Sequence, residues 1–236
     1  MVPVERDLAW DGCSNVRDLG GLPMGDGGTT PFGRVIRADN PSRLTAVGWE
    51  ALRAAGVRTV ITLRTLGTTD EEPDPAIVPD GIVIVRVDLE DATDPEFRRR
   101  CMDTGLWMTP LEWSEMLQHW PERCAAAVAT VAHARAGVAV ISCGIGRDRT
   151  GLVAFLLQAV VGVTAEAIAE DWSHSTGRLV GDPLAGDTPV SDILEREGST
   201  VERAVRAALD LGVESRLLAG GLGGSDLATV RSRLLG

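Results

Sequence analysis

The sequence of 236 residues predicts an α/β fold in which helices flank a central, mostly parallel sheet. Two observations lead to this prediction. Short β-branched apolar runs, typical of strands buried on both faces, alternate with segments of helical periodicity as far as residue 172. Helical patterns then fill most of the C-terminal part. No linker is long enough to split the chain, so we expect one domain over residues 1–236.

The elements of the N-terminal half follow from periodicity and from turn residues. We expect a strand at 33–37, a helix at 45–55, a strand at 57–63 and a strand at 82–87. Gly56 ends the helix, and the alternating β-branched run after it is typical of a strand. Three prolines and many acidic residues predict a loop over 67–81.

Capping signals mark the later helices. Thr109, Pro110 and Glu112 have the spacing of a helix start, with a Thr cap, Pro at the first position and Glu three residues after the cap. That helix is expected to continue to about residue 135, with a kink at Pro121. Further expected elements are a strand at 138–142, a buried helix from 150, a helix at 164–172 and a helix that begins with a capping box at 199–202.

Composition and charge limit the partners. The net charge of −11 argues against nucleic acid and anionic membranes as main partners. No signal-peptide core is found at the N-terminus, and the longest apolar run, residues 152–163, is too short to span a bilayer. We therefore expect a cytoplasmic protein without a membrane span. The sequence does not give the oligomeric state.

The cysteines predict neither a metal site nor a disulfide framework. No pair of them has zinc-ligand spacing, and only three histidines exist to help. A disulfide framework is unusual in so large a chain, and a reducing compartment keeps thiols usable. The four cysteines are Cys13, Cys101, Cys124 and Cys143.

The segment 142–151 carries the chemistry. It reads Ser-Cys-Gly-Ile-Gly-Arg-Asp-Arg-Thr-Gly, directly after an apolar strand and directly before a helix. Five residues separate Cys143 from Arg149, so one loop can surround a tetrahedral oxyanion with a sulfur beneath it and a guanidinium beside it. This arrangement predicts phosphoryl transfer through a cysteine thiolate.

Each position in the loop has an expected role. The N–H groups of the loop point at the anion at a helix start, and the same field favours a thiolate at Cys143. Arg149 offers a planar fork to two phosphate oxygens, and the Thr150 hydroxyl can assist departure of the sulfur. The residues expected to bind phosphate through the loop are Gly144, Ile145, Gly146 and Arg147.

The general acid has several candidates. Asp148 lies inside the loop and can protonate the leaving oxygen, and its structural alternative is a salt bridge to Arg147 or Arg64. Asp88, Asp91 and Asp94 follow the strand at 82–87, where they are either acid candidates on a mobile loop or ordinary solvated surface.

Two other interpretations of the loop stand beside the phosphatase one. Cys143 can be a buried core cysteine, but a core position requires neither two glycines nor an arginine at a helix start. A sulfurtransferase is a second thiolate enzyme, and its loop usually has one residue fewer between Cys and Arg. Here the position one short of Arg149 is Asp148, so the spacing suits phosphate better.

Three separated stretches resemble the atypical bacterial tyrosine phosphatases, also called protein tyrosine/serine phosphatases, of which some act on phosphoinositides. Asn-Val-Arg-Asp-Leu-Gly-Gly at 15–21, followed by Arg-Ala-Asp at 37–39, resembles the N-terminal signature. The segment 142–151 resembles the loop usually written His-Cys-x-x-Gly-Lys/Arg-Asp-Arg-Thr-Gly. Asp-Trp-Ser-His-Ser at 171–175 resembles the family's Asp-Tyr-x-x-Ser.

The resemblance implies Cys143 as the nucleophile, Arg149 as the phosphate ligand, Asp148 in proton transfer and Arg147 in substrate choice. It also implies a helical lid over the site, here at about 165–200, and no metal or organic cofactor.

The chain departs from the family at three positions. The family His before the cysteine is Ser142, the Asp of its Asp-Leu-Arg is Thr62, and the Tyr of the third segment is Trp172. Trp172 can stack over a substrate or pack in the core. Arg37, at a strand end, can face the site or form a structural ion pair with Asp18, Asp39 or Asp148. Arg17 is expected to fix the Gly-rich N-terminal turn.

We therefore expect a metal-independent phosphomonoester phosphatase that acts on phosphotyrosine or mixed phosphoprotein substrates. A first alternative keeps the mechanism but has a specialised sugar, nucleoside or lipid phosphate as substrate. A second is a pseudo-phosphatase that only binds phosphorylated partners. Ser142 is the main argument for that second alternative, while the retained Cys143 and Arg149 argue for an enzyme.

Overall fold

The computed structural model describes residues 6–68, 75, 78–179 and 189–236. Five of the strands that it describes form one sheet in the order β1-β2-β5-β3-β4. β2, β5, β3 and β4 are parallel, and β1 pairs antiparallel with β2 at one edge. The expected α/β class with a mostly parallel sheet is confirmed. The strands are β1 (Arg17–Asp18), β2 (Val35–Ala38), β3 (Val57–Leu66), β4 (Val83–Asp91) and β5 (Val138–Ser142).

Alternating side chains of the strands feed two separate cores. Val35, Ile61 and Ile141 point into the larger core, which the later helices cover. Their neighbours Ile36 and Val140 point to the smaller core under α1. Because successive side chains of a strand face opposite sides, both faces of the sheet are apolar and both need helices.

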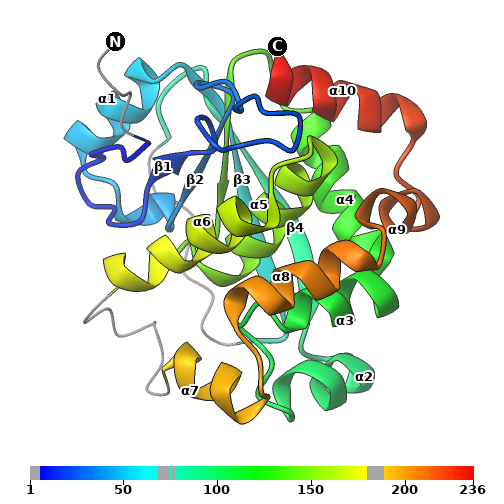
Figure 1. Ribbon diagram of the computed structural model, residues 1–236. Coiled ribbons are helices and arrows are strands. Elements are labelled where there is room, and N and C mark those ends of the chain that lie inside the picture. The colour runs from blue at the N-terminus through cyan, green and yellow to red at the C-terminus, as the bar shows by residue number, and fades with distance from the viewer. Residues whose placement is uncertain (1–5, 69–74, 76–77, 180–188) are drawn as a thin grey trace.

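The helices divide unequally between the two faces. In Figure 1, α1 (Ala46–Ala54) lies at the left of the sheet, while α3, α4, α9 and α10 lie at the right. The helices other than α1 are α2 (Pro95–Phe97), α3 (Glu112–His119), α4 (Pro121–Ala132), α5 (Asp148–Val160), α6 (Ala165–Arg178), α7 (Val190–Arg196), α8 (Val201–Asp210), α9 (Val213–Ala219) and α10 (Gly224–Leu235). Two further short helical segments are Pro41–Arg43 and Arg98–Met102.

Two expected elements differ from the structure. The helix expected at 109–135 is two helices, α3 and α4, because Trp120 leaves the helical region at φ −132° and ψ 48°. The residue before a proline avoids the helical conformation, so Pro121 starts a new helix instead of kinking the old one. The strand expected at 82–87 continues to Asp91, which places Asp88 and Asp91 in β4 and not in a mobile loop.

The cap expected at Thr109 is wrong, because α3 begins only at Glu112, after Leu111, and no side chain caps it. The capping box expected at 199–202 is displaced by one residue, with Thr200 as the cap of α8. Thr45, Thr164 and Thr200 each accept a hydrogen bond from a backbone N–H in the first turn of α1, α6 and α8. The lid expected at about 165–200 corresponds to α6, to α7 and to residues 180–188, which lie outside the described residues. Nothing in the described part tests whether this region closes over a site.

Candidate active site

The loop after β5 stands at the carboxyl end of the parallel strands. β5 ends at Ser142, α5 begins at Asp148, and the turn between them holds Cys143 at its start. The thiol is buried, with 6% of the residue exposed. Loops at this edge of an open α/β sheet form the usual ligand crevice. The strand-loop-helix arrangement expected for the segment is therefore present.

The carbonyl groups of the loop are bound from outside by the N-terminal part of the chain. The Asn40 N–H donates to the Gly144 carbonyl at 3.2 Å. The Asn15 Nδ2 group donates to the Ile145 carbonyl at 2.8 Å. The Arg37 Nη2 group donates to the Gly146 carbonyl at 2.8 Å and to the Arg147 carbonyl at 3.3 Å. Four consecutive carbonyls are thus fixed in orientation.

The N–H groups of the same residues are left available. Within the described chain, no group accepts a hydrogen bond from the N–H of Gly144, Ile145 or Gly146. Backbone N–H groups that converge in a turn ahead of a helix form an anion-binding concavity. The arrangement fits the role expected for these three residues.

The two loop glycines differ in what they permit. Gly146 has φ +69°, and a Cβ there would lie 2.6 Å from the Ala38 carbonyl carbon and oxygen. It therefore needs glycine for both conformation and space. Gly144 does not have a positive φ, and its Cβ would meet only Arg149 Nη2, at 3.8 Å. Of the two, only Gly146 takes the left-handed conformation.

A buried ion cluster supports the loop from below. Asp171 on α6 pairs with Arg17 at 2.9 Å, with Arg37 at 2.6 Å and with Arg6. Burial by itself raises the pKa of Asp171, but Arg37, Arg17 and Arg6 outweigh it and hold the carboxyl far below its usual range. Arg17 also donates to Asn15, so the cluster orients Asn15 and Arg37, the two residues whose side chains bind the loop carbonyls.

Arg149 extends from α5 towards β3. Its Nη1 group donates to the Leu63 carbonyl at 3.2 Å. Burial acts to lower its pKa, but the negative charges of Cys143, Glu90, Asp148 and Glu112 outweigh burial and raise it. The guanidinium is therefore charged and lies among acidic groups beside the thiol.

Asp148 and Arg147 form an ion pair within the loop, with Arg147 Nε 2.7 Å from Asp148 Oδ1. Burial raises the pKa of Asp148, and the adjacent Arg147 opposes that rise. The salt bridge considered from the sequence is thus present, and the raised pKa is what a proton donor requires. The Thr150 Oγ1 atom is buried and has no hydrogen-bond partner among the described residues.

The other acid candidates are either exposed or bound by other side chains. Asp88 is exposed on β4. Asp91 pairs with Arg123 at 3.0 Å, and its hydrogen bond from Thr93 lowers its pKa. Asp94 caps α2 and accepts from Trp120 Nε1 at 2.9 Å. Each of these three has an evident structural role or a solvated position.

Trp172 and Arg37 are both buried. Trp172 is 2% exposed and packs on the first turn of α5, where a Cβ at Gly151 would lie 2.6 Å from its ring. The glycine that ends the loop motif therefore makes room for an indole. Arg37 reaches the loop from behind and pairs with Asp171, not with the acidic partners Asp18, Asp39 or Asp148 considered from the sequence.

Sequence reasoning missed four residues around the loop. Asn15 and Asp171 lie in the two outer stretches that resemble the family, so the signal was present but their contact with the loop was not visible. Glu90 and Glu112 are buried near Arg149 and carried no signal, since one lies in a strand expected to have ended and the other was taken as a helix cap. Arg17, expected to fix the Gly-rich turn, instead binds Asp171.

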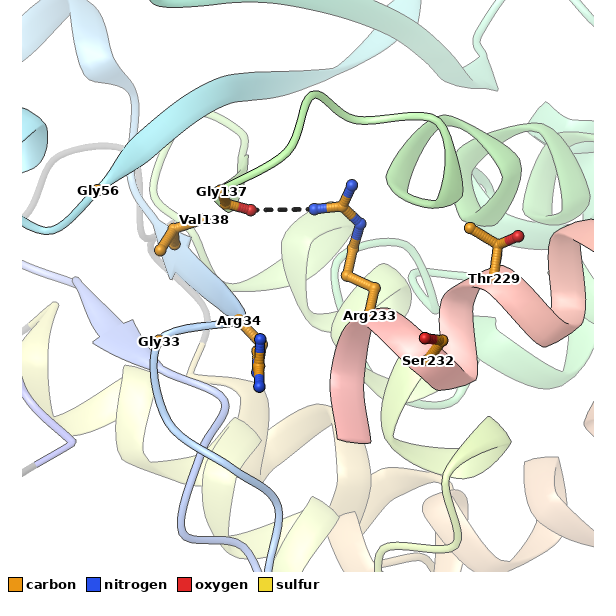
Figure 2. A pocket seen from close by; sticks show the side chains of 8 residues that line it. All are labelled: Gly33, Arg34, Gly56, Gly137, Val138, Thr229, Ser232 and Arg233. Atoms are coloured by element: carbon orange, nitrogen blue, oxygen red, sulfur yellow. Dashed lines mark hydrogen bonds between the residues drawn. The ribbon is translucent and has the colours of Figure 1, made fainter. Parts of the chain in front are cut away.

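A pocket of about 510 Å³ lies at the opposite end of the sheet, at the amino ends of β2, β3 and β5. Figure 2 shows Arg34 and Arg233 among its lining residues, with Arg233 donating to the Gly137 carbonyl at 3.0 Å. Arg233 also donates to the Ala134 carbonyl, after the end of α4. These carbonyl contacts occupy its outer nitrogens and give it a structural role.

No group of three or more His, Cys, Asp or Glu side chains could hold a metal ion in the part of the chain described. No helix among those residues is long and apolar enough to cross a membrane.

Comparisons with known proteins agree on one family. The chain matches a family model described as the tyrosine phosphatase family from residue 8 to residue 234. It is 30% identical to a putative tyrosine-protein phosphatase of Cupriavidus necator over 178 residues, which are 73% of this chain and 64% of that protein. It is 27% identical to a tyrosine-protein phosphatase of Nostoc commune over 159 residues, 66% of this chain and 53% of that protein. The chain thus aligns with less than two thirds of either relative.

Proposed function

The chain belongs to the tyrosine phosphatase family, and on that premise we propose that it is a metal-independent phosphomonoester phosphatase that works through a phosphocysteine on Cys143. The observation that carries the proposal is the loop itself. Its carbonyls are bound from behind by Asn40, Asn15 and Arg37, and its N–H groups remain available beside a buried thiol and a charged Arg149.

In the first step Cys143 Sγ attacks phosphorus. The S–P bond forms as the bond to the leaving oxygen breaks, and Asp148, as the carboxylic acid, gives its proton to that oxygen. Loop N–H groups and Arg149 stabilise the charge on the three equatorial oxygens. The buried position of Asp148, which raises its pKa, supports its role as the acid.

In the second step water attacks the phosphocysteine. The Asp148 carboxylate accepts a proton from that water, the S–P bond breaks, and the sulfur leaves as thiolate. Inorganic phosphate departs, and the enzyme returns to its starting state with Asp148 protonated. The buried Thr150 hydroxyl, which lacks a partner among the described residues, is available to donate to the departing sulfur.

The substrate class that we propose is phosphotyrosine in proteins. The names of the two relatives support it, since both are called tyrosine-protein phosphatases. Arg147, which takes the position of the substrate-choosing loop residue in the family resemblance, is buried and forms an ion pair with Asp148 within the loop. We treat residues 1–236 as one domain with this single activity.

The test is hydrolysis of an aryl phosphate in EDTA. Wild type is expected to turn over, and Cys143→Ser to lose turnover by about a thousandfold or more, because the nucleophile is gone. Cys13→Ser is the matched control, since Cys13 is half-buried outside the loop and a serine hydroxyl can replace the contact of its thiol with the Asn40 carbonyl. Equal activity in Cys143→Ser and wild type would contradict the covalent mechanism.

The same assay separates the substrate classes. With a phosphotyrosine peptide, a phosphoserine peptide and sugar phosphates compared by kcat/KM, the phosphotyrosine peptide is expected to rank first. A sugar phosphate in first place would assign a small-molecule phosphatase. Binding of every phosphoester without turnover would assign a phosphate-binding module.

A further inference from the structure

Two buried carboxyl groups near Arg149 have no part in the mechanism above. Glu90 stands at the end of β4 and is 1% exposed, and Glu112 is the first residue of α3 and is 3% exposed. Acidic side chains are almost never fully buried without a paired cation. Neither glutamate has a salt-bridge partner within 4.0 Å in the described chain. They therefore need an explanation.

Adjacent residues of one short segment hold the two carboxyls. Trp107 Nε1 donates to Glu90 Oε2 at 3.0 Å, and the Met108 N–H donates to Glu112 Oε2 at 3.2 Å. Met108 has φ +66°, a left-handed conformation that is unfavourable for a residue with a side chain. The segment thus adopts an unfavourable backbone conformation while bringing a donor to each glutamate.

The two carboxyls differ in how well their charge is satisfied. Glu90 Oε2 also accepts from the Thr65 hydroxyl at 2.5 Å, so two donors stabilise a carboxylate there. Glu112 has a single donor, and its Oε1 atom is buried without a hydrogen-bond partner in the part of the chain described. Hydrogen bonds to the charged form favour ionisation, and a buried oxygen that lacks them disfavours it.

The surrounding charges also favour a proton on Glu112 over a proton on Glu90. The negative charge of Glu90 acts on Glu112, and Asp148 adds a second negative charge when it is ionised. The positive charge of Arg149 acts on both glutamates, and the charges of both glutamates act on Cys101, in the helical segment before α3. Burial raises the pKa of Glu112 well above its usual range, and the charge of Glu90 raises it further. Burial also raises the pKa of Glu90, but Arg149 opposes that rise.

We propose that this pair holds one proton on Glu112 and one negative charge on Glu90, and that the single charge sets how strongly Arg149 binds an oxyanion. The inference rests on the proposed function, because it takes the Cys143 loop as the oxyanion site. Both glutamates are positioning residues, since they act through Arg149 and not on the substrate.

The proposal has a definite sign. While Glu112 stays neutral, one carboxylate balances Arg149 and the guanidinium retains attraction for a dianion. When pH rises and Glu112 loses its proton, a second negative charge faces Arg149 and competes with the bound anion. Oxyanion affinity therefore falls as pH rises, and binding of a dianion in that range takes up a proton.

Sulfate binding to Cys143→Ser protein tests this by calorimetry between about pH 6 and pH 10, where sulfate itself does not titrate and the reactive thiol is absent. We expect the sulfate affinity to fall by about tenfold across the range. A fall of this size corresponds to a difference of about one unit between the pKa of Glu112 in the free and in the sulfate-bound protein. Glu112→Gln, a neutral mimic of the protonated acid, should keep the affinity seen at low pH and abolish the fall. Glu115→Gln, one turn further along α3 and paired with Arg100, should retain the fall.

Glu90→Gln gives a second, independent prediction. Without the negative neighbour, Glu112 ionises more easily, so the fall in affinity should move to lower pH. A structural role for Glu90 alone would lower affinity at every pH without moving the midpoint. An unmoved midpoint, or an unchanged fall in Glu112→Gln, contradicts the proposal.

Two measurements need no substitution in the pair. Infrared spectra at neutral pH of a protein with both Cys143→Ser and Asp148→Asn should show the C=O stretch of a protonated carboxyl other than Asp148, and sulfate binding to this protein in buffers of different ionisation enthalpy should show proton uptake. Absence of both contradicts the pair. If the substituted protein shows both signals but the wild-type protein hydrolyses no phosphomonoester, only the proposed function is contradicted. Sulfate binding involves neither the thiol nor a leaving group, so the proposal for the two glutamates would stand.

Discussion

Ser142 and Thr62 are register partners on the adjacent parallel strands β5 and β3. Ser142 is fully buried and donates to the Ile61 carbonyl at 3.3 Å, and Thr62 Oγ1 is buried without a partner among the described residues. These are the two positions at which the family resemblance has His and Asp. The two departures are thus neighbours in space, and two hydroxyl groups stand where the resemblance has an imidazole and a carboxylate.

Because the two positions are register partners, substitutions that restore the family's His and Asp should have coupled effects on stability. Ser142→His alone places an imidazole in a dry strand with no carboxylate opposite, and is expected to destabilise the fold by about 1–3 kcal/mol. Ser142→His with Thr62→Asp should recover a part of that loss, with a coupling of about 0.5–3 kcal/mol in urea unfolding. Only the double variant should also speed alkylation of Cys143 at about pH 6. Additive losses would show that the positions do not interact.

The two loop glycines offer a matched pair for stability. Gly146→Ala must relieve both a positive φ and an approach of 2.6 Å to the Ala38 backbone, and should cost about 1–3 kcal/mol. Gly144→Ala meets only the flexible end of Arg149, and its cost should stay within about 0.5 kcal/mol. Chemical unfolding of both variants checks the difference. Equal losses would mean that the loop is not pressed against β2.

The ion cluster at Asp171 should make stability sensitive to acid. The arginines hold the folded pKa of Asp171 below its unfolded value of about 3.9, so its contribution is present above that pH and is lost below it. Asp171→Asn should lose about 3–5 kcal/mol at neutral pH, because three arginines lose their counter-charge. The difference in free energy of unfolding between Asp171→Asn and wild type should become smaller as pH falls below about 4. Urea unfolding over this range measures it, with the exposed Asp210→Asn as the unaffected control.

Loss of the proton donor should depend on the leaving group. Asp148→Asn is expected to lower kcat by about 10²- to 10⁴-fold for an alkyl phosphate, whose leaving oxygen requires a proton. For a nitrophenyl phosphate, which leaves without one, the loss should be much smaller. Burial raises the pKa of Asp148, so wild-type activity towards the alkyl substrate should fall on the alkaline side of that pKa, and the variant should lack this limb. Equal losses on both substrates would assign Asp148 a purely structural role with Arg147.

The sequence by itself determined the features that are local in the chain. The strand, the turn and the helix start of the loop lie within ten consecutive residues, so their patterns and the spacing from Cys143 to Arg149 could be interpreted directly. The parallel sheet followed from β-branched runs, since strands buried on both faces must be apolar throughout. Helix starts could be predicted to within a few residues, since a first turn requires hydrogen-bond acceptors, and the capping box expected at 199–202 lies one residue from the observed cap at Thr200.

Only the tertiary structure decided what supports the loop and what surrounds Arg149. Asn15 and Arg37 reach the loop carbonyls from 130 and 109 residues away, and a side-chain contact across that separation leaves no periodicity to read. The sequence could not place Glu90 in a strand, because β4 lies at the edge of the sheet. Arg86 and Asp88 are exposed on this strand, so its sequence has the composition of a loop. Glu90 and Glu112 come together only in the folded chain, where adjacent residues Trp107 and Met108 donate a hydrogen bond to each. Their burial depends on the neighbouring elements and not on the residue's own segment.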